Sequence, residues 1–158
     1  MAGSLTVVGL DEVLGKFNAI GEQAEAVASM SLWEGAKVVA DEYNRTLASI
    51  PAEEFVYVFN GEKRNASIEE KAALIGSAGV AKFQKSGSEV QTIIGTKNAY
   101  ATIAGKQVPV KLLLRAINSG TSFRHKNPFI RKIKSTAKGA AQVAIVNKGN
   151  AMLETLLK

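Results

Sequence analysis

Side chains suited to acid–base catalysis are few in this sequence and poorly partnered. The single histidine, His125, lies between Arg124 and Lys126, and no carboxylate is near it along the chain. A histidine that acts as a general base needs an orienting partner, most often a carboxylate. We therefore interpret His125 as a loop or surface residue, and we expect no catalytic site and no enzymatic activity.

Metal and redox chemistry have equally little support. The sequence holds no cysteine, which excludes disulfides, thiolate nucleophiles and cysteine-ligated metal centres. The acidic pairs Glu53–Glu54 and Glu69–Glu70 are adjacent along the chain, so the two side chains of a pair point in different directions and do not share a ligand. We expect no metal site, no cofactor and no small-molecule substrate.

A basic second half is the strongest chemical signal. Residues 1–96 carry 8 Lys and Arg against 13 Asp and Glu, a net charge of −5, whereas residues 97–158 carry 12 against Glu154 alone, a net charge of +11. The candidate basic surface consists of Arg115, Arg124, Lys126, Arg131, Lys132, Lys134 and Lys138. The candidate acidic counter-surface consists of Asp11, Glu12, Glu22, Glu25, Asp41 and Glu42.

Three interpretations of this charge split stay open. Lys and Arg displace condensed counterions from nucleic acid, so the basic half is suited to contact with DNA phosphates. Few base-reading side chains accompany the cations, which argues against sequence-specific recognition. The other interpretations are a solvated face, and docking of the basic half onto the acidic half of an identical neighbour in a head-to-tail ring.

The N-terminal part of the chain has the pattern of a long amphipathic helix. Apolar residues recur every three or four positions from Leu10, which predicts a helix over about residues 10–49 that Pro51 ends. The glycines within it leave a kink or two stacked helices as alternatives. An extended segment and loop are expected over residues 51–66. The capping-box spacing of Ser67 and Glu70 then predicts a short helix, with a strand over residues 72–75 as the alternative.

The remaining elements form a small sheet and two helices. We expect the sheet over about residues 72–104, with a hairpin of residues 80–85 and 89–95 and a third strand at 100–103. Helices are expected at about 110–118, where Gly120 is placed to end the first, and at 128–157, where Pro128 opens the second. The fold class is therefore α+β, one domain over residues 1–158, with a long N-terminal helix and a C-terminal helix packed on a small antiparallel sheet. No signal peptide or membrane span is apparent, so we expect a soluble protein in a reducing cytoplasm.

Three stretches of the sequence together resemble a known family. They are Gly9-Leu10-Asp11-Glu12-Val13-Leu14 at the start of the first helix, Ile117-Asn118-Ser119-Gly120-Thr121-Ser122, and Asn127-Pro128-Phe129-Ile130-Arg131. In this order they resemble the neck and tail-completion proteins that join head to tail in long-tailed bacteriophages. In that family a Gly-Thr-Ser turn precedes a Pro-Phe element that starts the last helix.

The resemblance implies a non-enzymatic structural protein of the virion neck or tail, assembled in the host bacterial cytoplasm. Its expected partners are identical copies in a ring, other neck and tail proteins, and DNA that passes through the ring, with no membrane partner. Gly120 and Thr121 are then the family turn, and Pro128 and Phe129 open and anchor the last helix. A tail-terminator ring protein and a non-specific nucleic-acid-binding protein are the alternatives.

Overall fold

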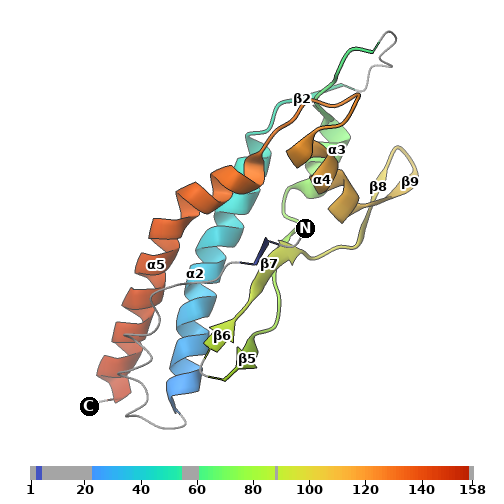
Figure 1. Cartoon of the computed structure of the whole chain (residues 1–158). Coiled ribbons are helices and arrows are strands. Elements are labelled where there is room, and N and C mark those ends of the chain that lie inside the picture. Colours follow the sequence, from blue (N-terminus) through green and yellow to red (C-terminus); the bar gives the residue numbers. More distant parts are fainter. Residues whose placement is uncertain (1–2, 5–22, 55–60, 88, 157–158) are drawn as a thin grey trace.

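Two long helices set the length of the molecule. In this computed structural model, which describes residues 3–4, 23–54, 61–87 and 89–156, helix α2 covers Gln23–Ala48 and helix α5 covers Phe129–Leu156. The two run antiparallel, side by side (Figure 1). At about 1.5 Å per residue each is about 40 Å long. The predicted helix over 10–49 is confirmed from residue 23 to 48, and its first part, residues 10–22, lies outside the described residues.

Small side chains bring α2 and α5 close together. Each helix buries a row of residues four positions apart, which is the spacing of one ridge on a helix surface. The rows are Val27, Ser31, Gly35, Val39, Tyr43 and Leu47 on α2, and Phe129, Ile133, Ala137, Ala141, Ile145 and Gly149 on α5. A Cβ added at Gly35 would lie 2.5 Å from Cγ1 of Ile145 and 3.1 Å from the carbonyl oxygen of Ala141. Gly35 therefore marks a point of close approach.

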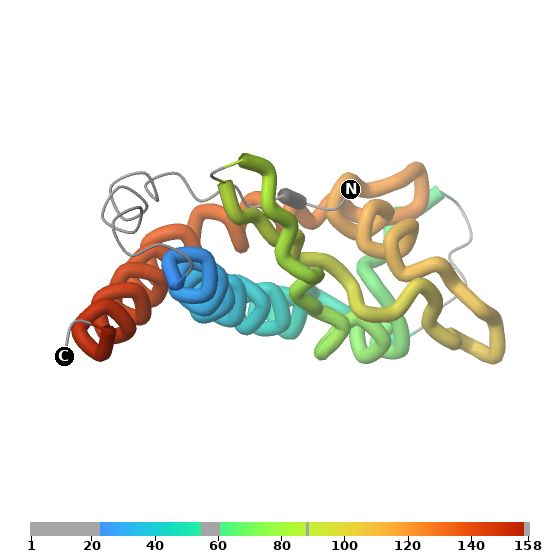
Figure 2. The backbone as a smooth tube through the Cα atoms, turned by 90° about the horizontal axis from the view of Figure 1, so that it is seen from below, coloured from blue at the N-terminus to red at the C-terminus, as the bar shows by residue number. Residues whose placement is uncertain are grey.

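Short strands cover the other side of α2. The central β7 (Ile93–Thr96) pairs antiparallel with β1 (Gly3–Ser4) and with β4 (Ala78–Val80). Seen along the helices and from the side, α2 lies between α5 and these strands (Figures 1 and 2). The prediction of two long helices packed with a small antiparallel sheet in an α+β fold is confirmed.

The predicted hairpin around Ser86-Gly87-Ser88 is present, but it is divided into two parts. Beyond β4 and β7, the strands β5 (Gln84–Ser86) and β6 (Glu89–Gln91) pair antiparallel. Between the pairs Val80↔Ile94 and Gln84↔Gln91, one arm has three residues and the other has two, which is a β-bulge. The β5–β6 part is largely exposed.

The capping box decides the structure of residues 66–75. Helix α3 (Ile68–Leu74) begins after Ser67, which is the last residue of β3 (Ala66–Ser67), and β3 pairs in parallel with β2 (Ala52–Glu53). The predicted short helix is correct and the alternative strand over 72–75 is wrong, because Ser67 and Glu70 cap the helix reciprocally. The sheet region accordingly starts at Ala78 rather than at residue 72.

A second hairpin precedes the last two helices. The expected third strand is β8 (Tyr100–Ile103), but it pairs with the unpredicted β9 (Lys106–Pro109) and not with the β4–β7 sheet. Ala104 and Gly105 form the two-residue turn with φ of 48° and 74°, as a type I′ turn requires. Helix α4 (Val110–Ser119) follows directly and ends before Gly120, as predicted.

Replacement of Gly35 by leucine should destabilise the fold by about 1–3 kcal/mol, because the added side chain has no room between α2 and α5. The matched control is Gly139→Leu on the exposed face of α5, where an added Cβ meets nothing within 4 Å. There the higher helix propensity of leucine should raise stability by about 0.5–1 kcal/mol. Urea unfolding of both variants measures the difference, and equal effects at the two positions would contradict the close approach.

Candidate functional site

Glu70 is the centre of a buried ionic cluster. Its backbone N–H donates to Oγ of Ser67 over 3.1 Å, and its Oε2 accepts the backbone N–H of Ser67 over 2.8 Å. The same carboxylate accepts two hydrogen bonds from the guanidinium of Arg124, one of them 2.7 Å long between Nη1 and Oε2. Arg64 donates two further bonds of 3.3 Å. One carboxylate therefore caps α3 and binds two cations.

Arg124 is buried, which corrects its assignment to the basic surface. Its relative exposure is 7%, and the backbone around it is fixed by hydrogen bonds from the Arg64 N–H to the Phe123 carbonyl and from the His125 N–H to the Arg64 carbonyl, each 2.9 Å long. The sequence places Arg124 in a run of cations, but its partner Glu70 lies 54 residues earlier. Nothing in the local pattern indicates this pairing.

The environment of Glu70 favours its charged form. Burial alone would raise the pKa of Glu70, but the hydrogen bonds from Arg124, Arg64 and the Ser67 backbone outweigh it and lower the pKa from 4.5 to about 2. Hydrogen bonds and opposite charges act on the ionised state in this direction. Glu70 is thus ionised at neutral pH. The cluster has a structural role, because its charged groups bind one another and join α3 to the α4–α5 connection.

The α4–α5 connection contains the residues that carry the family resemblance. Gly120 has φ 74° and ψ 169°, a region open essentially only to glycine, and a Cβ there would lie 3.0 Å from the backbone nitrogen of Lys126. Thr121 exchanges backbone hydrogen bonds with Arg124. Exposed Pro128 directly precedes Phe129, which is 1% exposed and stacks edge-on against Tyr43. Gly120, Thr121 and Phe129 therefore each have a structural role in this connection, and Pro128 stands directly before α5.

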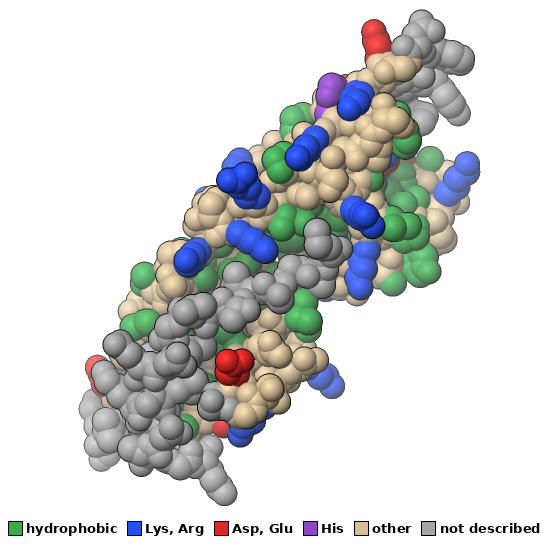
Figure 3. All heavy atoms as spheres, in the orientation of Figure 1, with side chains coloured by type: hydrophobic (Ala, Val, Ile, Leu, Met, Phe, Trp, Pro, Cys, Tyr) green, Lys and Arg blue, Asp and Glu red, His purple; other side chains and the backbone are tan. Residues whose placement is uncertain are grey.

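The other predicted surface cations are exposed. They are Arg115, Lys126, Arg131, Lys132, Lys134 and Lys138. On α5, positions 131, 134 and 138 share one side of the helix, because residues three and seven apart lie on the same face. Figure 3 shows Lys and Arg side chains over α4 and the first half of α5.

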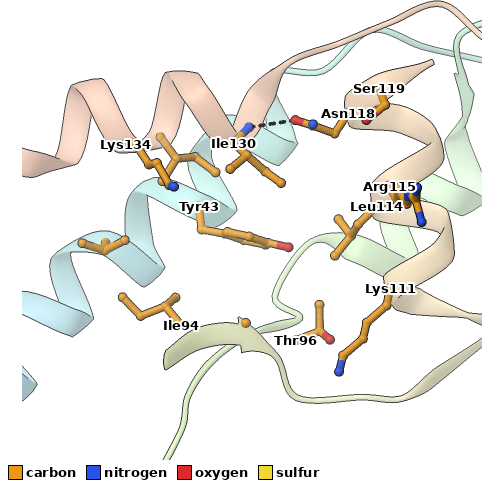
Figure 4. A pocket seen from close by; sticks show the side chains of 13 residues that line it. Tyr43, Ile94, Thr96, Lys111, Leu114, Arg115, Asn118, Ser119, Ile130 and Lys134 are labelled. Atoms are coloured by element: carbon orange, nitrogen blue, oxygen red, sulfur yellow. Dashed lines mark hydrogen bonds between the residues drawn. The ribbon is translucent and has the colours of Figure 1, made fainter. Parts of the chain in front are cut away.

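A cavity of about 210 Å³ lies among these cations. It is formed where α4 and α5 meet α2 and β7, and its apolar lining includes Tyr43, Ile94 and Leu114 (Figure 4). Lys111, Arg115 and Lys134 also line it. The Ile130 N–H donates to Oδ1 of Asn118 over 3.2 Å and joins α4 to α5 beside the cavity (Figure 4). Sequence reasoning missed Tyr43 and Lys111, because the elements that carry them meet only in the folded chain.

The described residues do not bring the predicted acidic counter-surface together as one patch. Asp11, Glu12 and Glu22 lie outside them. Asp41 is exposed, and Glu25 is paired with Lys85 over 2.5 Å. Glu42 is a correction, because it is only 9% exposed and binds Thr46 and Arg45 of its own helix.

Metal-binding groups, the single histidine and membrane-spanning helices were predicted to be absent or without a chemical role, and the described residues give one observation on each. No group of three or more His, Cys, Asp or Glu there is placed to hold a metal ion. His125 is exposed. No described helix has the length and apolar character needed to cross a membrane.

Comparisons of the chain with protein-family models, with curated proteins and with solved structures give no match.

The Glu70 cluster predicts an acid-sensitive fold. The pKa of Glu70 is lowered from 4.5 to about 2 in the folded chain. At pH values above 4.5 the ionised carboxylate therefore stabilises the fold, and this contribution is lost as the pH falls from about 5 towards 2. Glu70→Gln should cost about 3 kcal/mol at pH 7, because it leaves the buried Arg124 without its counter-charge. Urea unfolding at pH 7, 5 and 3 should show less loss of stability with acid in the variant than in the wild type.

The control for this prediction is Glu54→Gln. Glu54 is exposed, and no hydrogen bond or ion pair joins it to another described residue, so the change should alter stability by less than about 0.5 kcal/mol. Similar losses in the two variants, or an unchanged acid response in Glu70→Gln, would contradict the role of the cluster.

Proposed function

We propose that the protein is a structural subunit of the head–tail junction of a long-tailed bacteriophage. In this proposal it assembles with identical copies into a ring in the neck or tail and contacts other neck and tail proteins. The observation that carries the proposal is the structure of the α4–α5 connection, in which Gly120 and Phe129 of the family-like stretches have defined structural roles. Gly120 takes a conformation that other residues resist, and Phe129 anchors α5 in the core.

The shape and charge of the subunit support assembly. Two helices of about 40 Å offer long lateral surfaces, and α5 carries exposed cations at Arg131, Lys132 and Lys138. The exposed carboxylate of Asp41 lies on α2. Opposite charges exposed on two helices of one chain suit a heterologous, head-to-tail contact, which closes into a ring when the rotation between copies allows it.

A tail-terminator ring is the alternative within the virion. Such a ring is also built from small α+β subunits. The neck and tail-terminator proposals are therefore distinguished by the particle that the ring binds. A neck protein binds the head connector, and a terminator binds the end of the tail tube.

A non-specific nucleic-acid-binding protein is the second candidate, and the exposed cations of α4 and α5 are the observation that favours it. Lys111 and Arg115 are four residues apart on α4, and Arg131, Lys134 and Lys138 share one side of α5. Such clustering is the electrostatic footprint of phosphate binding.

Ring assembly is tested by light scattering over a range of concentrations, together with electron microscopy. We expect a closed ring at high concentration, or a monomer that forms rings on heads or tails purified from the phage that encodes the chain. Raised salt should weaken assembly, because exposed charge pairs are screened. A chain that stays monomeric and decorates neither heads nor tails would contradict the proposal.

Duplex DNA binding separates the two candidates. As a ring subunit, the isolated chain should shift DNA only weakly in a gel, and the shift should disappear by about 0.2 M salt. The control is Arg131→Gln/Lys138→Gln, which should weaken any shift without a change in folding. Tight binding by the monomer, with a slope of about −4.5 in log K against log salt for five phosphate contacts, would favour the nucleic-acid-binding protein.

A further inference from the structure

The cavity between α4 and α5 has the character of a binding pocket. Tyr43 is only 9% exposed, and its ring extends into the space near Leu114 (Figure 4). Its hydroxyl makes no hydrogen bond to any other described residue. The hydroxyl oxygen is not among the inaccessible unpartnered polar atoms of the described residues, which are Oγ of Ser77 and Oγ1 of Thr121. It is therefore accessible, and it can bond to an occupant of the cavity.

The rim of the cavity is cationic and uncompensated. Lys111, Arg115 and Lys134 are exposed, and no Asp or Glu is among the lining residues. Elsewhere in the described chain the cations Lys37, Arg45 and Lys85 each pair with a carboxylate. The three rim cations form no ion pair with any described residue. Their charges are therefore available to an anionic partner.

The size of the cavity limits what enters it. Its volume of about 210 Å³ lies below the roughly 300–1,000 Å³ of ordinary small-molecule pockets. Interface anchors, in contrast, are single apolar side chains that fill a pocket while polar groups surround it. A phosphate backbone alone would leave the apolar floor of Tyr43, Ile94 and Leu114 uncovered.

We propose that the cavity receives one apolar side chain from an acidic segment of another protein, whose flanking carboxylates bind Lys111, Arg115 and Lys134. The aromatic or aliphatic anchor lies against Ile94 and Leu114. The Tyr43 hydroxyl donates a hydrogen bond to a carboxylate or backbone carbonyl of the segment. Burial raises the pKa of Tyr43 to about 12, so the hydroxyl keeps its proton for donation at neutral pH. The proposal does not depend on ring assembly.

The experiment titrates ¹⁵N-labelled protein with a capped peptide that has a central phenylalanine and two glutamates on each side. We expect saturable amide shifts confined to the residues around the cavity, such as Thr96, Leu114 and Ile130. Affinity should fall by about tenfold or more when serine replaces the phenylalanine, or when glutamines replace the glutamates. No saturable shift up to about 5 mM peptide would overturn the proposal.

Two variants with the same change of charge locate the site. Lys111→Gln/Arg115→Gln/Lys134→Gln should weaken binding of the peptide by about tenfold. Lys126→Gln/Arg131→Gln/Lys138→Gln changes three exposed cations that do not line the cavity, and it should leave affinity within about twofold. Equal weakening in both would show attraction by net charge alone and overturn the proposal. All six side chains are exposed, and thermal unfolding checks that both variants fold.

Two further measurements test the occupant. Thr96→Trp adds a large side chain at the cavity wall (Figure 4) and should abolish binding of the peptide, while Tyr43→Phe should weaken it severalfold. The triple Lys/Arg variant decides the result if Thr96→Trp does not fold. Benzoate serves as the small-carboxylate probe. Binding of benzoate as tight as that of the peptide would assign the cavity to small carboxylates and overturn the proposed protein segment.

Discussion

The hydrogen bonds and ion pairs of the Glu70 carboxylate hold together the part of the molecule around α3, β3 and the α4–α5 connection. The carboxylate accepts hydrogen bonds from the backbone of Ser67 and from the side chains of Arg64 and Arg124. These groups belong to the start of α3, to the segment before β3 and to the α4–α5 connection. Because one buried anion binds all three, the position of the connection, and with it the entry into α5, is coupled to a helix of seven residues.

The packing of α2 against α5 depends on the fit of their side chains and not on charge. Along α2 and α5 the contact is made by alanine, serine and glycine at the middle of the pair and by larger side chains such as Leu47 and Phe129 near one end. Small residues allow close backbone approach, and the larger ones fill the space where the helices meet α4 and the strands. The cavity lies at that end, where three helices and one strand converge without filling the volume completely.

Local sequence signals predicted most elements, and distant pairings account for what they missed. The end of α2 near Pro51, the Ser67–Glu70 capping box, the hairpin around Gly87 and the helices on either side of Gly120 are each set by residues close in sequence. The β1–β7 pairing joins residues about ninety positions apart, and no local pattern specifies it. Arg124 was predicted to lie on the basic surface because a run of cations shows the type of side chain but not its burial. Its buried partner Glu70 lies 54 residues away. The cavity lining was beyond prediction, since Tyr43 and Lys111 meet only through tertiary packing.

The β5–β6 hairpin determines how the exposed end of the sheet presents its backbone to other strands. Its two strands are only three residues long and carry Gln84, Lys85 and Glu89 on exposed positions, and the bulge at residues 81–83 separates it from the β4–β7 pair. Short strands, lysine and bulges are the features by which proteins keep an open sheet edge from recruiting another strand. The exposed end of this sheet is thereby protected against edge-to-edge aggregation, because the β5–β6 hairpin offers only a short and interrupted row of backbone groups to another strand.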